Sequence, residues 1–186
     1  MTGGYYEPIL PAIPDDDKLG QIAKMTQTVE QRFGQHPSGL WLTERVWEPH
    51  LPAALNKAGV AWTVLDDTHF KLSGLDDKDL FGYYLTEEQG LPVKVFATSK
   101  ALRYMIPWKS VAEVIDYLHQ EASEGPKIAV MGDDGEKFGV WPKTYVHCWE
   151  NGWVDEFFEA LEQNRDWLKM VFPGEYAAQF SSLGRV

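Results

Sequence analysis

KIAVMGDDGEKFGVWP, residues 127–142, joins a short apolar run to a cluster of charged side chains. In a parallel α/β protein a buried strand reads as such an apolar run, and catalytic groups follow the carboxyl ends of the strands. The carboxylates of Asp133, Asp134 and Glu136 repel one another, so the pKa of at least one of them is expected to rise. The alternative is a solvated acidic turn, because Asp-Asp-Gly is common turn chemistry.

Two further apolar segments also end in acidic residues. The segment GLWLTERVW, residues 39–47, delivers Glu44, and residues 60–65 are followed by Asp66 and Asp67, with His69 close behind. The carboxyl ends of parallel strands share one edge of a sheet, so these acids are expected to gather there with Asp133 and Asp134. Three acidic strand ends on one edge indicate a site.

The remaining pattern predicts an α/β protein in which helices cover both faces of a parallel sheet. Helical spacing and capping residues predict helices at 15–33, 49–58, 76–81, 110–122, from 144 onward and at 154–163. Strands are expected at 83–86, 93–97 and 127–131, with a strand-like segment at 167–172 and an aromatic loop at 102–108. We find no internal repeat, and residues 1–186 are interpreted as a single domain.

Composition limits the class of protein. The chain has 44% hydrophobic residues and eight tryptophans, as expected of a globular core. Its net charge of −11, from 17 basic and 28 acidic residues, disfavours nucleic acids and anionic membranes as partners. The single cysteine, Cys148, and the lack of a basic and apolar leader favour a cytoplasmic location.

Paired carboxylates beside tryptophans suit the cleavage of a glycosidic bond. One carboxyl group protonates the leaving oxygen, and the other attacks or activates water. Trp41, Trp47 and Trp141 adjoin the acidic residues, and aromatic faces are good platforms for the apolar faces of sugars. GxGxxG and GxxxxGK[ST] motifs are missing, as is HxxxH spacing, so neither a cofactor nor a metal is expected.

Several motifs together resemble glycoside hydrolase family 57. The segments GLWLTERVWEP (39–49) and MGDDGEKFGVWP (131–142) resemble two of its signature regions. The segments GGYYEPIL (3–10), DDTHF (66–70) and LRYMIPW (102–108) resemble its 4-α-glucanotransferase and α-amylase branch. The resemblance implies an irregular seven-stranded (β/α) barrel that acts on α-1,4-glucans with retention of configuration. It leaves open whether the sugar is transferred to another glucan or to water.

The resemblance also assigns roles to individual residues. Glu44 matches the catalytic nucleophile, and Asp134 matches the general acid/base. The substrate is expected to contact Trp41, Trp141, Asp67 and His69. The residues expected to support the two carboxylates are Arg45, Asp133, Glu136 and Lys137; Arg45 or Lys137 would keep Glu44 ionised, and crowding would raise the pKa of Asp134.

The chain departs from the family by lacking its His-Gln-Pro and Gly-x-x-Glu motifs. It is therefore expected to be an internal piece of the enzyme, a partial barrel without the first strands. Open sheet edges would then favour self-association. Two alternatives remain: a glucan-binding fragment without turnover, and a metal-dependent deacetylase on a related barrel, which the missing HxxxH spacing disfavours.

Overall fold

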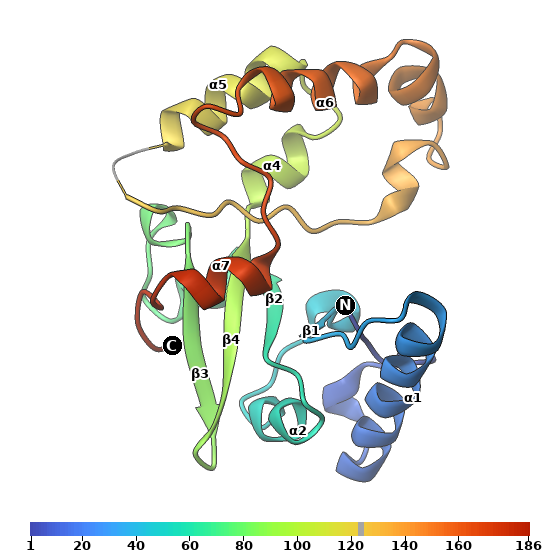
Figure 1. The fold of residues 1–186 in the computed structure, drawn as a ribbon, viewed down its shortest axis with the longest axis vertical. Helices are drawn as coiled ribbons and strands as arrows, with labels where there is room; N and C mark the ends of the chain where they lie inside the picture. The colour runs from blue at the N-terminus through green and yellow to red at the C-terminus, as the bar shows by residue number, and fades with distance from the viewer. Residues whose placement is uncertain (123–124) are drawn as a thin grey trace.

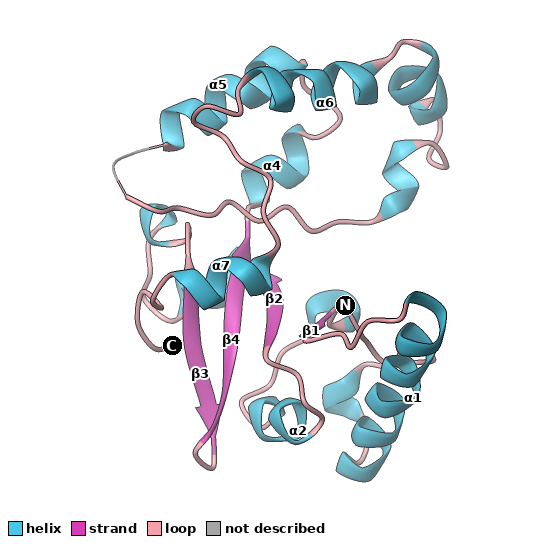
Figure 2. Cartoon of the chain, viewed as in Figure 1, coloured by secondary structure: helices cyan, strands magenta, loops and turns pink. Residues whose placement is uncertain are grey.

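The computed structural model describes residues 1–122 and 125–186. A central sheet lies between two groups of helices (Figures 1 and 2). Helices α1 (Asp15–Phe33) and α2 (Leu51–Lys57) lie beside the sheet. Beyond the carboxyl ends of its parallel strands lies a helical layer that contains α4 (Lys100–Met105), α5 (Val111–Glu121) and α6 (Trp153–Gln163).

The sheet has four strands in the order β1-β2-β4-β3. Strands β1 (Gly39–Leu40), β2 (Trp62–Asp66) and β4 (Leu91–Thr98) are parallel, whereas β3 (Tyr83–Glu88) runs antiparallel to β4. The hairpin turn uses positive φ at Gln89 and Gly90, which matches the twist of the paired strands. The α/β class is confirmed, but the expected parallel sheet is mixed.

Both faces of the sheet are covered, as predicted. On one face Leu65, Val93 and Val95 pack with Ile22 of α1 and Leu55 of α2. On the other face a second core cluster contains Trp62, Val64 and Phe96 of the sheet and Tyr176 of α7 (Pro173–Gln179). Figure 1 shows α7 crossing this face. Neighbouring residues of a strand point to opposite faces, so β2 contributes to both cores.

Several predicted strands are wrong. Residues 127–131 contribute one bridge, Thr98 with Val130, because β3 already pairs with β4 as far as Phe96. Residues 167–172 form a turn and an irregular connection, since the N–H groups of Trp167 and Leu168 both donate to Asn164 O. The strand expected at 39–47 stops at Leu40. Part of the aromatic loop expected at 102–108 is helical, in α4.

Short chain segments pair with both outer edges of the sheet. The N–H of Thr2 donates to Gly39 O (2.7 Å), and Trp41 N–H donates to Thr2 O (2.9 Å). At the other edge, residues 183–186 form three backbone hydrogen bonds with Tyr83 and Leu85 of β3, each 2.9–3.0 Å long. The open edges expected from the sequence are therefore partly covered.

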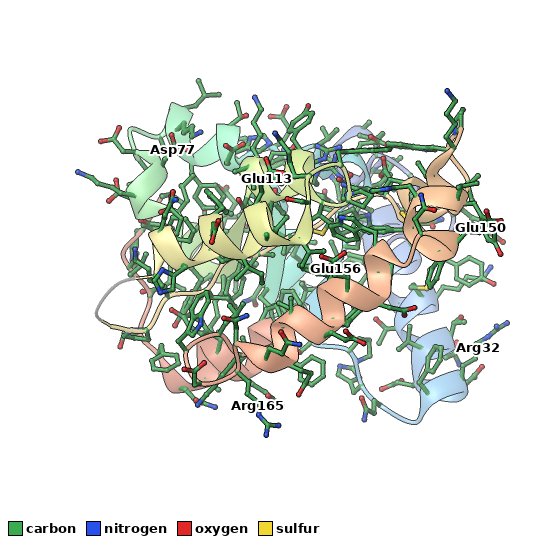
Figure 3. The ribbon with its side chains drawn as sticks, turned by 90° about the horizontal axis from the view of Figure 1, so that it is seen from above. Arg32, Asp77, Glu113, Glu150, Glu156 and Arg165 are labelled. Atoms are coloured by element: carbon green, nitrogen blue, oxygen red, sulfur yellow. The ribbon has the colours of Figure 1, made fainter. Side chains whose placement is uncertain are left out.

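Helices α1 and α5 have the capping residues expected from the sequence. Ser110 caps α5 in a reciprocal capping box with Glu113, and Gly34 ends α1 at φ 69°. Seen from above, α5 and α6 lie side by side, with Glu113 and Glu156 labelled on their first turns (Figure 3). The other helical segments are η1 (Leu10–Ala12), η2 (Thr43–Arg45), α3 (Asp67–Leu72), η3 (Asp77–Asp79), η4 (Gly135–Phe138) and η5 (Val146–Glu150).

Within the described ranges no helix has the length and apolar character needed to cross a bilayer.

Candidate active site

The carboxyl ends of β1, β2 and β4, together with the bridge residue Val130, form one edge of the sheet, which we call the acidic edge. Glu44 follows β1, Asp66 ends β2, and Asp133 and Asp134 follow Val130. Glu44, Asp66, Asp133 and Asp134 thus follow or end segments at the same edge of the sheet, as expected, whereas Asp67 does not join them. Parallel pairing sets this arrangement, because it brings like ends of the strands together.

Glu44 lies on a strained turn. Its backbone has φ 52° and ψ 9°, and Arg45 follows with φ 54°. Non-glycine residues seldom occupy this left-handed region, and such strain persists where the surrounding structure enforces it, often at functional sites. His69 Nε2 donates to Arg45 O at 3.3 Å and so supports the turn. The Glu44 side chain remains exposed.

Five alternating charges run along the acidic edge and form what we call the charge chain: Arg45, Asp66, Arg103, Asp133 and Lys137. Asp66 Oδ1 lies 3.0 Å from Arg45 Nε and 3.9 Å from an Arg103 terminal nitrogen. Asp133 binds Arg103 Nε at 3.0 Å and Lys137 Nζ at 2.5 Å. Arg45 Nε is close to Asp66 but not directed to donate, so this contact is an ion pair without a hydrogen bond.

Asp133 is the most enclosed anion of the charge chain. Its side chain is 4% exposed, and that of Lys137 is 1% exposed. Burial acts to raise the pKa of Asp133, but the hydrogen bonds from Lys137, the Asp134 N–H and Arg103, with the charge of Lys137, hold it below its ordinary value. Asp133 is therefore an ionised anchor that joins α4 to residues 133–137.

Two expected contacts are replaced by others. Arg45 pairs with Asp66, and Lys137 pairs with Asp133, so both cations are directed at aspartates and not at Glu44. The sequence interpretation placed Asp66 at this edge but gave it no role in the site, and it did not consider Arg103. Alternation along β2 was the available signal for Asp66, since it shares a face with Trp62 and Val64.

Asp67 lies apart from the charge chain. Its carboxylate accepts from Lys71 Nζ at 2.8 Å. With Tyr104 and Tyr117 it lines a separate cleft of about 480 Å³. Asp66 is the last residue of β2 and enters the charge chain, whereas Asp67 is the first residue of α3 and does not.

Two of the predicted sugar platforms adjoin the acidic edge. The Arg45 guanidinium lies 5.5 Å from the ring centre of the partly buried Trp41. Trp141 is 41% exposed and stacks on Trp108, with ring centres 6.4 Å apart and planes at 11°. The side chains of Asp134 and Glu136 are exposed. Glu136 O accepts from the N–H of Trp141 at 3.0 Å, which folds the segment back on itself.

The side chains that could bind a metal are dispersed. Among residues 1–122 and 125–186, no three His, Cys, Asp or Glu side chains are grouped to hold an ion. The acidic edge itself presents carboxylates beside cations and aromatic rings.

The sequence and the fold of the chain are similar to those of known proteins. A profile described as Glycosyl hydrolase family 57 matches residues 1–185. Alpha-amylase 1 of Dictyoglomus thermophilum is 52% identical over 165 residues, which are 88% of this chain and 24% of that protein. The 4-alpha-glucanotransferase of Thermococcus litoralis is 44% identical across 100% of this chain and 28% of its own. A crystal structure of 4-alpha-glucanotransferase from that organism superposes with a TM-score of 0.96, at 43% identity, over 100% of this chain and 29% of that one. The chain thus spans about a quarter of the length of these relatives.

Proposed function

The chain belongs to glycosyl hydrolase family 57, and from that premise we propose that it is the catalytic segment of an enzyme that cleaves α-1,4-glycosidic bonds in α-glucans. The relatives named as α-amylases and 4-α-glucanotransferases support this substrate class. The observation that carries the proposal is the acidic edge, where Glu44 follows β1 and Asp134 follows Val130, and where each lies next in sequence to a member of the charge chain, Arg45 and Asp133.

The proposed reaction has two steps and retains configuration. Asp134 first protonates the glycosidic oxygen while the Glu44 carboxylate attacks the anomeric carbon, so the C–O bond breaks and a glycosyl-enzyme ester forms. Asp134, now ionised, then takes a proton from a sugar hydroxyl or from water, which attacks the anomeric carbon and releases Glu44. Transfer and hydrolysis differ only in this second step, in which the attacking group is a sugar hydroxyl for transfer and water for hydrolysis.

A curved sheet would bring the two carboxyl groups together. Retention needs them about 5–5.5 Å apart. In a flat sheet the three strand steps from β1 to the Val130 segment would span about 14 Å at about 4.8 Å per step. We infer that the sheet is a section of a closed, seven-stranded (β/α) barrel, in which both loops turn toward the barrel axis. The charge chain, which runs from Arg45 to Asp133, supports this inference because it bridges the same span.

The test is product analysis with maltotriose. Glu44→Ala and Asp134→Ala should each lower turnover by at least about a hundredfold. Added azide should yield a glycosyl azide of inverted configuration from Glu44→Ala, because azide attacks the anomeric carbon in place of the missing carboxylate. It should yield one of retained configuration from Asp134→Ala, because azide there attacks the glycosyl-enzyme ester in place of water or a sugar hydroxyl. Glu48→Gln is the matched control, since it removes another exposed acid of the same segment.

The second candidate is a glucan-binding segment without turnover, favoured by the exposed Trp108 and Trp141. In that case maltotriose binds but no product forms in the unaltered chain. Full activity in Glu44→Ala would refute the assignment of the nucleophile.

A further inference from the structure

Trp108 and Trp141 form a stacked, solvent-facing pair, which we call the tryptophan pair. Trp108 is 49% exposed and Trp141 is 41% exposed. The ring centres are 6.4 Å apart and the planes differ by 11°, so the indoles are nearly parallel and offset. A tryptophan normally buries most of its large apolar surface, and clustered exposed aromatic rings mark binding sites.

The backbone on each side of Trp108 is fixed by side chains of a later segment. His147 Nε2 donates to Pro107 O at 2.7 Å, and Trp153 Nε1 donates to Lys109 O at 2.8 Å. Pro107 itself is buried. The exposed indole therefore projects from an anchored loop.

Trp141 is anchored in the same way. Its N–H donates to Glu136 O at 3.0 Å, and its own carbonyl accepts from the N–H and hydroxyl of Thr144, at 3.0 Å and 2.7 Å. A backbone that is already fixed on both residues needs little further ordering when a ligand arrives, which lowers the entropic cost of binding.

Trp108 and Trp141 each follow a segment that contributes to the charge chain. Trp141 follows Asp134 within the folded-back segment of η4, while Trp108 follows α4, the helix that Arg103 ties to Asp133. The two indoles thus come from two segments held together by the charge chain. A glucan bound at Trp141 would have Trp108 within reach, because the two rings stack on each other.

We propose that Trp108 forms an outer glucosyl subsite, so that the tryptophan pair binds two units of one α-glucan. This inference rests on the proposed function. The part of each indole face that the other ring leaves uncovered would carry the apolar C–H face of one sugar ring while the hydroxyls stay in water. The ligand is a neutral oligosaccharide, in keeping with a chain of net charge −11. Trp108 would act on chain length and not on bond cleavage.

The experiment measures the dissociation constants of the chain for maltose through maltoheptaose by calorimetry. The unaltered protein should bind longer oligomers more tightly. Trp108→Leu should abolish that gain, weakening maltoheptaose binding by about three- to tenfold while leaving the shortest ligand that binds unchanged. Trp108→Phe should restore part of the gain because it keeps an aromatic face. Phe33→Ala, at an exposed aromatic residue on α1, should bind as the unaltered chain does.

The outcomes separate this inference from the proposed function. If Trp108→Leu matches the unaltered chain at every length while Trp141→Leu weakens binding, the outer subsite is refuted and the glucan site stands. If no oligomer binds the unaltered chain, both fail. If Trp108→Leu instead dissociates a dimer seen by light scattering and leaves glucan binding intact, the tryptophan pair is a contact between copies, and the proposal is overturned.

Discussion

At the scale of single residues, Glu44, the proposed nucleophile, has an unfavourable backbone conformation. A left-handed conformation costs about 1–2 kcal/mol for most residues, and asparagine tolerates it better than glutamate. Glu44→Asn should therefore unfold at a higher temperature than the unaltered chain, with a gain of about 0.5–1 kcal/mol.

Glu44→Gln is the matched control, since it removes the same charge and keeps the longer side chain. Both variants should lose turnover, whereas only the asparagine variant should gain stability in thermal or denaturant unfolding. Equal stabilities for the two variants would argue against strain at Glu44.

Asp133 predicts an effect of pH on stability. Its folded-state pKa lies below the ordinary value of 3.8, so the stabilisation is complete above that value and is lost as the pH falls through the folded pKa. Asp133→Asn leaves Lys137 buried without its anion and should cost about 3–5 kcal/mol at pH 7. The difference from the unaltered chain should shrink below about pH 4, as followed by urea unfolding across pH.

Asp77→Asn is the control for this prediction. Asp77 is 85% exposed and pairs with Lys71 at the surface, so its loss should matter little. A pH-independent difference for Asp133→Asn would contradict the assigned charge state.

The sequence indicated which short segments bring acidic residues to one edge of the sheet, but not how their side chains pair. Glu44, Asp133 and Asp134 were found because each follows an apolar run. A substrate contact was expected of Asp67 and not of Asp66, and Arg103 was not considered, because their pairing depends on which strand lies beside which. That order is set by distant contacts, which local pattern does not encode.

At the scale of elements, the helices with strong end signals were predicted well. Charged first turns and a glycine stop located α1, and the capping box located α5. Residues 127–131 have a strand composition but lack a free partner, because β3 occupies most of the edge of β4. Competition for pairing partners is invisible in any one segment, so this strand was predicted where only a bridge forms.

The two-residue strand β1 depends on a glycine. A Cβ built at Gly39 would lie 2.2 Å from the Trp62 ring, so Gly39→Ala should force the indole to move. We expect a loss of about 1–3 kcal/mol in denaturant unfolding. Gly20→Ala, inside α1 with nothing within 4 Å of the added methyl, should instead gain about 0.5–1 kcal/mol. If the free energy of unfolding falls for Gly39→Ala and rises for Gly20→Ala, the close approach of Gly39 to the Trp62 ring is confirmed.

At the scale of the whole molecule, the coverage of the sheet edges bears on self-association. Residues 183–186 occupy the outer edge of β3 with three backbone hydrogen bonds, and Leu183 packs over Gly82. An uncovered strand edge pairs readily with another chain. Deleting residues 183–186 should raise the self-associated fraction in sedimentation velocity, more so at high salt, where the repulsion between chains of charge −11 is screened.

Arg185→Ala serves as the control for the deletion. It removes only the exposed ion pair with Glu87, at 3.0 Å, and keeps the backbone pairing. If the chain without residues 183–186 self-associates no more than Arg185→Ala does, these residues do not protect the edge of β3.

The turn at Glu44 and Arg45 also bears on how such a protein evolves. Selection for thermal persistence alone would replace Glu44 early, since asparagine fits the local backbone better. Only selection for turnover would keep the glutamate in place. A library screened first for heat resistance and then sequenced at position 44 would therefore record which of the two pressures has acted.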